Sequence, residues 1–98
     1  MNINAMMKQA QQLQNKLLAE KKAIDEKCFE GKSSLVTVVM TGDKKLKDVK
    51  INMDELTGDD VEILQDMILL AVNDAIDKID IETNEKMGKY TQGMPGLF

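Results

Sequence analysis

The fold of this chain is decided by the stretch Leu35-Val36-Thr37-Val38-Val39-Met40-Thr41-Gly42-Asp43-Lys44. Its first six residues are rich in β-branched side chains and apolar on both faces, which predicts a strand covered on both sides. Its last four are typical of a turn. The following run, Leu46–Met53, alternates, with Val49, Ile51 and Met53 on one face. The sequence therefore predicts an antiparallel hairpin with strands at about residues 35–41 and 46–53. Residues at about 28–32 are predicted to add a short third strand.

A long amphipathic helix is predicted on each side of these strands. The first covers about residues 3–27, where apolar residues recur at three- and four-residue spacing. Its apolar stripe consists of Ile3, Met6, Ala10, Leu13, Leu17 and Ile24. The second covers about residues 59–88, with Asp59 as N-cap and Glu62 at the capping-box position. Its middle, Met67–Val72, is apolar nearly all round, so we expect it to be buried from more than one side.

These helices are too long for a compact domain of 98 residues. At 1.5 Å per residue they measure roughly 40 Å and 43 Å, whereas a compact domain of this size is about 30–35 Å across. Both should overhang the sheet as an antiparallel pair, and a second subunit would cover what one chain leaves exposed. The residues expected in the core or in a dimer interface are Leu35, Val36, Val38, Met67, Ile68, Leu70 and Ala71.

The prediction is thus one α+β domain over residues 1–92, with the order α-β-β-β-α and a small antiparallel sheet. Two long helices would project from it as an arm. Residues 93–98, which include two glycines and the one proline, are predicted to be a flexible tail. Because the longest apolar run is far shorter than a membrane span and no secretion signal opens the sequence, we expect a cytosolic protein.

The charges are divided along the chain. All thirteen basic residues are lysines, and residues 1–53 hold ten of them against six acids, or about +4. The remaining residues hold three lysines against eleven acids, or about −8. The net charge of −4 is therefore the sum of a positive first part and a negative second part. Whether the chain can bind nucleic acid then depends on where the lysines lie in the fold.

The composition argues against an enzyme. Without histidine or arginine, catalysis would depend on carboxylates, lysine or the lone Cys28, which we expect to be a buried small residue. No cluster predicts a metal site, and no glycine-rich loop predicts a phosphate cofactor or a small-molecule substrate. Met6 and Met7 are expected to pack in the core. A solvated acidic face is predicted for the second helix, made by Glu62, Asp66, Asp74, Asp77 and Asp80.

The lysines of the first helix admit two interpretations. Lys8, Lys16 and Lys22 lie opposite the apolar stripe, and Lys21 lies nearer to it. They form either an ordinary solvated face or a row of phosphate contacts, to which Lys86 and Lys89 of the second helix would add. Since arginine is absent, bidentate recognition of guanine is missing, so DNA binding would be weakly specific and strongly dependent on salt.

Seven short segments, in this order and spacing, resemble the YbaB/EbfC family of bacterial nucleoid-associated proteins. They are Met7–Gln14; Leu35–Val38 with Gly42; Val49–Ile51 with Leu56; Leu64–Asp66; Ala71–Ala75; Glu85–Met87; and Gly93–Gly96. The resemblance implies an α-β-β-β-α protomer that forms a tweezer-like homodimer, lies in the cytoplasm and nucleoid, and binds double-stranded DNA with little sequence preference. Nucleoid organisation and gene regulation would follow.

Two hypotheses result. The first is a homodimeric, non-enzymatic DNA-binding protein that uses Lys8, Lys16, Lys21 and Lys22, with Lys86 and Lys89 as secondary contacts. It would need no cofactor and no membrane. The alternative is a protein-interaction adaptor that uses its acidic second helix and has little affinity for DNA.

Overall fold

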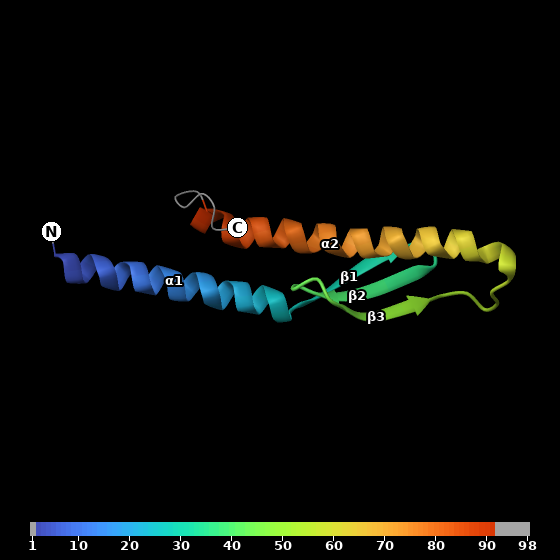
Figure 1. Ribbon diagram of the computed structural model, residues 1–98, viewed down its shortest axis with the longest axis horizontal. Coiled ribbons are helices and arrows are strands. Elements are labelled where there is room, and N and C mark those ends of the chain that lie inside the picture. Colours follow the sequence, from blue (N-terminus) through green and yellow to red (C-terminus); the bar gives the residue numbers. More distant parts are fainter. Residues whose placement is uncertain (1, 92–98) are drawn as a thin grey trace.

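A computed structural model describes residues 2–91 of the chain and the side chains of residues 2–88. Two long helices enclose three strands in the sequence, as α1 (Ile3–Glu26), β1 (Cys28–Ser33), β2 (Val36–Thr41), β3 (Leu46–Ile51) and α2 (Val61–Thr91). The strands form one antiparallel sheet in the order β1-β2-β3 (Figure 1). The predicted α+β class and the α-β-β-β-α order are therefore confirmed. The predicted tail, residues 93–98, lies outside the described residues.

The central strand is the β-branched run that the sequence singles out. Its alternate residues Val36, Val38 and Met40 are buried, and they point to the face that α2 covers. The turn to β3 is closed by Lys44, whose backbone N–H donates to the Thr41 carbonyl at 2.8 Å and whose φ is 65°. Both strands of this hairpin are shorter than predicted, because pairing starts at Val36 and ends at Ile51.

The core lies where α2 crosses β1 and β2. Ala71, Ala75 and Ile79 on α2 are buried against the central strand. The small alanines let the helix come close, and Gly31 of β1 completes this approach. A Cβ added at Gly31 would stand 2.1 Å from the Ala71 carbonyl oxygen. The contact between α2 and β1 thus depends on the absence of a side chain there.

The molecule is a long rod of 71 × 20 × 14 Å. Figure 1 shows α1 and the sheet lying end to end along one side of α2, with α1 running past the described end of α2. The helices therefore overhang the sheet, as their predicted lengths require.

The N-terminal part of α1 is less covered than its sequence predicts. Only Leu17 and Ile24 of the apolar stripe pack on the core, whereas Ile3, Met6 and Leu13 are exposed. The expectation that Met6 and Met7 pack in the core is therefore wrong for the single chain, because α1 extends beyond its partner helix. The apolar residues of α1 recur with the spacing of a helix, but within one chain no second surface covers its N-terminal part.

The middle of α2 is also only partly covered. Met67 and Ile68 are half-buried, but the neighbouring Leu69 and Leu70 are exposed. The predicted burial of Met67–Val72 from more than one side is wrong for one chain, because the sheet covers a single face of the helix.

The start of α2 differs from the prediction. A 3-10 turn, Gly58–Asp60, precedes the helix, and the N-cap is Thr57 rather than Asp59. The Asp60 carboxylate reaches back to accept the Thr57 backbone N–H at 3.0 Å. Thr57 and Asp60 thus form the capping box that the sequence predicted for Asp59 and Glu62, two residues earlier, because a 3-10 turn precedes α2.

Candidate nucleic-acid interface

Three of the predicted contact residues form a row on α1. Lys8, Lys16 and Lys22 are exposed, and no carboxylate of the described chain lies within ion-pair distance of any of them. Their face is opposite Leu17 and Ile24, which turn toward α2. A cation without a partner can neutralise a phosphate without first giving up an internal ion pair, so these three ammonium groups are available to DNA.

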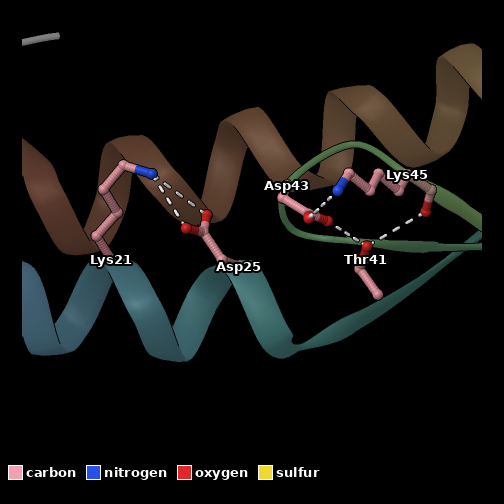
Figure 2. A network of polar contacts seen from close by, with 5 residues as sticks. All are labelled: Lys21, Asp25, Thr41, Asp43 and Lys45. Atoms are coloured by element: carbon pink, nitrogen blue, oxygen red, sulfur yellow. Dashed lines mark hydrogen bonds and ion pairs between the residues drawn. The ribbon is translucent and has the colours of Figure 1, made fainter.

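Lys21 and Lys86, by contrast, already have carboxylate partners. The Lys21 Nζ lies 3.1 Å from the Asp25 carboxylate, one helical turn later (Figure 2). The Lys86 Nζ lies 4.0 Å from Glu82, at the outer limit of an ion pair. Exposed pairs of this kind contribute about 0–1 kcal/mol, so DNA could displace them, but each partner lowers the local positive field. The side chain of Lys89 lies outside the described residues.

The acidic face predicted for α2 is smaller than its sequence implies. Asp80 pairs with Lys44 of the β2–β3 turn, with Nζ and Oδ1 3.1 Å apart. Asp74 accepts the backbone N–H of Lys32 at 2.9 Å and lies 3.3 Å from the Lys78 ammonium. Both carboxylates therefore have partners within the chain, and Asp80 is still exposed to solvent. Glu62, Asp66 and Asp77 remain without a hydrogen-bond partner in the described chain.

Neighbouring donors lower the pKa of two carboxylates, Asp74 on α2 and Asp43 in the β2–β3 turn. The Lys32 backbone N–H and then the Lys78 ammonium hold the pKa of Asp74 below its ordinary value. At the hairpin turn, the Thr41 hydroxyl donates to Asp43, and Lys45 lies beside that carboxylate (Figure 2). This hydrogen bond first, and then the charge of Lys45, lower the pKa of Asp43. Both acids are thus held ionised by their neighbours.

The space between the two helices does not suit an anion. A cleft of about 440 Å³ lies between the C-terminal part of α1 and that of α2. Its charged lining residues are Glu20, Lys27, Glu82, Glu85 and Lys86. The Lys27 Nζ is held by Glu82 at 2.6 Å, and three carboxylates against two lysines leave the cleft negative. Phosphate is therefore expected on the outer face of α1 and not between the helices.

The residues predicted for core or dimer packing separate into two groups. Val36, Val38 and Ala71 are buried within one chain, and Leu35, Met67 and Ile68 are half-buried beside them. Leu70 is exposed and contributes nothing to the core of one chain.

Nothing in the described residues suggests chemistry. No group of three or more cysteine, histidine or acidic side chains could hold a metal ion there. Cys28 is exposed at the start of β1, which corrects the expectation that it is buried. It begins an edge strand on the face away from α2. Within residues 2–91, neither helix is apolar enough over a sufficient length to cross a bilayer.

The sequence analysis missed the lysines that neutralise α2. The pairing of Lys78 with Asp74 was detectable, because the two are four residues apart on one helix. Lys27–Glu82 and Lys44–Asp80 were not, since they join residues that only the fold brings together.

Comparison with known proteins identifies the class as a family of DNA-binding proteins. The sequence pattern of the YbaB/EbfC DNA-binding family matches residues 1–94, and the chain belongs to that family. The family is one of DNA-binding proteins and not of enzymes.

Its relatives match over nearly their whole length. A nucleoid-associated protein of Enterococcus faecalis is 45% identical over 98 residues, covering 98% of this chain and 94% of the relative. Another of Lactococcus lactis subsp. cremoris is 46% identical over 97 residues, covering 97% and 98%. The crystal structure of HP0035 from Helicobacter pylori has a TM-score of 0.69 at 20% identity and covers 94% of this chain and 97% of that one. This last similarity supports the fold alone.

Proposed function

We propose that this protein is a homodimeric nucleoid-associated protein that binds double-stranded DNA with low sequence specificity. It would act in the cytoplasm on the nucleoid and contribute to nucleoid organisation and gene regulation. The observation that carries this proposal is the row of exposed lysines on α1, Lys8, Lys16 and Lys22, which have no carboxylate partner among the described residues. Membership of a DNA-binding family and the names of the relatives support the same partner.

The low specificity follows from the side chains available. Lysine binds phosphate as a point charge, and phosphate contacts carry no sequence information. The chain has no arginine with which to hold a guanine edge by two hydrogen bonds.

The experiment is an electrophoretic shift of random duplex DNA across a salt series. Replacing Lys8, Lys16 and Lys22 together by Gln should weaken binding on every sequence. It should also reduce the slope of log K against log salt by about 0.9 for each phosphate that the variant no longer neutralises. The matched control replaces Lys27, Lys44 and Lys78 by Gln, which removes the same charge from lysines that already have carboxylate partners. If both triple variants lose affinity equally, the contacts are not on α1.

The proposed homodimer is supported by an exposed apolar surface that β3 and α2 form together. Because α2 covers β1 and β2 but not β3, the inner face of β3 is open. Leu46 and Val49 are exposed there, and Leu69 is exposed on α2. In a two-fold dimer, the same surface of a second copy would cover this apolar surface. A chain of this size gains most from such burial, because it buries little surface alone.

An adaptor that binds a basic protein is the second candidate. It is favoured by the exposed Ile63 and Leu70 on α2, which lie among the unpaired carboxylates Glu62, Asp66 and Asp77. Its surface is limited, since Asp74 and Asp80 are neutralised within the chain. A pull-down with and without nuclease separates the two functions. Partners lost with nuclease support DNA binding, whereas partners retained when DNA affinity is absent support the adaptor.

A further inference from the structure

The sheet has a second face that turns away from α2 and carries charges in rows. Its register places side chains of three strands side by side. One row consists of Lys32, Thr37 and Lys50, and the next of Glu30, Val39 and Asp48. Neighbouring strands are about 4.8 Å apart, so the two lysines of the first row are about 10 Å apart across Thr37.

A third lysine joins this face at an irregularity in the pairing. The register of β2 and β3 shifts between Val39 and Met40, which makes Lys47 an extra residue on β3. Its Nζ lies 4.0 Å from the sulfur of Cys28, which is exposed on this same face. The outer face of the sheet thus holds Lys32, Lys47 and Lys50.

This sheet face and the lysine face of α1 lie on the same side of the molecule. Leu17 and Ile24 turn one face of α1 toward α2, and Val36 and Val38 turn one face of the sheet toward the same helix. Because α1 and the sheet lie end to end along α2, their opposite faces form one long surface (Figure 1). Lys8, Lys16 and Lys22 lie on its helical part.

The charge of this surface is positive, although the whole chain carries −4. Six lysines lie on it, against the carboxylates Glu26, Glu30 and Asp48. Residues 8–26 of α1 span about 27 Å, and a six-residue strand adds about 20 Å. The total of about 47 Å exceeds one turn of duplex DNA, which is about 34–36 Å.

We propose that the outer face of the sheet is a second DNA contact, in which Lys32, Lys47 and Lys50 continue the phosphate contacts of α1. The inference rests on the proposed DNA binding and deepens it. The partner is the backbone of double-stranded DNA, because a duplex supplies phosphates along the whole length of this surface. The Lys32 Nζ already lies 3.4 Å from the Glu30 carboxylate, and Glu30 and Asp48 repel the same phosphates, so both acids weaken this contact.

Two variants with opposite expected effects test the proposal. Replacing Lys32, Lys47 and Lys50 together by Gln should lower the affinity for random duplex DNA about tenfold. The salt slope should fall by about 0.9 for each phosphate that these lysines neutralise in the wild type. Replacing Glu30 and Asp48 by Gln should raise the affinity at the same salt. A gain of affinity cannot come from misfolding, and circular dichroism checks the fold of the lysine variant.

The matched control replaces Glu62 and Asp66 by Gln. It removes the same two negative charges from a face of α2 that lies away from the proposed surface, and the affinity should change by less than about twofold.

The outcomes separate the two proposals. If the sheet lysine variant binds like the wild type while the α1 variant loses affinity, this inference is overturned and the proposed function stands. An equal rise in the acidic-residue variant and its control would also overturn it, since net charge alone would then explain the effect. Wild-type protein that binds no duplex at low salt would overturn both.

Discussion

Gly31 sets how closely α2 can lie on the sheet. A methyl group there would stand 2.1 Å from the Ala71 carbonyl oxygen and 2.7 Å from the Ala75 nitrogen, and backbone atoms cannot move aside as a side chain can. We expect Gly31→Ala to lower the free energy of unfolding by at least about 2 kcal/mol, measured by urea denaturation.

The control for Gly31 is the same substitution at Gly88, within α2, where an added Cβ meets nothing within 4 Å. Gly88→Ala should leave stability unchanged or raise it by up to about 1 kcal/mol, because alanine favours the helix. Equal effects at the two glycines would contradict the close approach at Gly31.

Asp74 makes stability depend on pH. The Lys32 N–H and the Lys78 ammonium lower its pKa in the folded protein. A lowered folded-state pKa means that the ionised carboxylate stabilises the fold above the ordinary aspartate range. This contribution is lost as the pH falls through the lowered value. Asp74→Asn should therefore be less stable than the wild type at pH 7 and lose less stability on acidification to about pH 2, measured by urea denaturation at each pH.

Asp77→Asn provides the comparison for this measurement, because Asp77 has no partner in the described chain. It should keep the acid sensitivity of the wild type. If Asp74→Asn and Asp77→Asn lose equal stability between the two pH values, the hydrogen bond to Lys32 does not hold the Asp74 charge.

At the scale of the element, α1 has one continuous apolar stripe but two different environments. Ile24 is 4% exposed in the core, whereas Leu13, eleven residues earlier in the same stripe, is 40% exposed. We expect Ile24→Ala to lower the free energy of unfolding by about 3 kcal/mol and Leu13→Ala by less than about 1 kcal/mol. Both are measured by urea denaturation at one protein concentration. Equal losses would show that a second surface covers the N-terminal part of α1.

This contrast shows what the sequence could predict and what it could not. The period of the stripe identifies the helix, because side chains at three- and four-residue spacing share a face. It carries no information on which part of that face has a partner, because Leu13 and Ile24 differ only in what the folded chain places opposite them. The β-branched run of β2 was easier to interpret, since Val36 and Val38 are buried by the local alternation of a strand.

The candidate DNA-binding site could likewise be predicted from the sequence only in part. The positions of Lys8, Lys16 and Lys22 on one face follow from helical geometry, so the sequence predicted them. The acidic surface of α2 was overestimated, because Lys44 and Lys32 reach Asp80 and Asp74 only after the hairpin folds back on the helix. The outer face of the sheet was missed because a lysine in a strand gives no sign of its neighbours until the register is known.

At the scale of the whole molecule, the lysines and the acids lie on different sides of the rod. The lysines of α1 and of the outer sheet face lie away from α2, and the unpaired acids Glu62, Asp66 and Asp77 lie on α2 itself. A dimer closed through the apolar surface beside β3 would leave the lysine surface of each copy exposed, because Val49 and Lys50 point to opposite faces of the sheet. DNA binding and dimerisation then use different faces and do not compete.

The apolar surface beside β3 gives the last prediction. Val49 is 42% exposed on the inner face of β3, and a carboxylate there would be buried without a partner in the proposed dimer. We expect Val49→Glu to weaken dimerisation at least about 100-fold, equivalent to about 2.7 kcal/mol. Light scattering at micromolar concentration should then give the mass of one chain, 11.0 kDa, where the wild type gives twice that mass.

Ile81→Glu is the matched control for Val49→Glu, because Ile81 is 58% exposed on the side of α2 away from β3. It adds the same charge and should leave the dimer intact. A wild-type protein that remains monomeric at micromolar concentration would refute the homodimer. A dimer that Ile81→Glu dissociates and Val49→Glu does not would place the interface on the outer side of α2, where it would cover Glu62, Asp66 and Asp77 and leave the apolar surface beside β3 exposed.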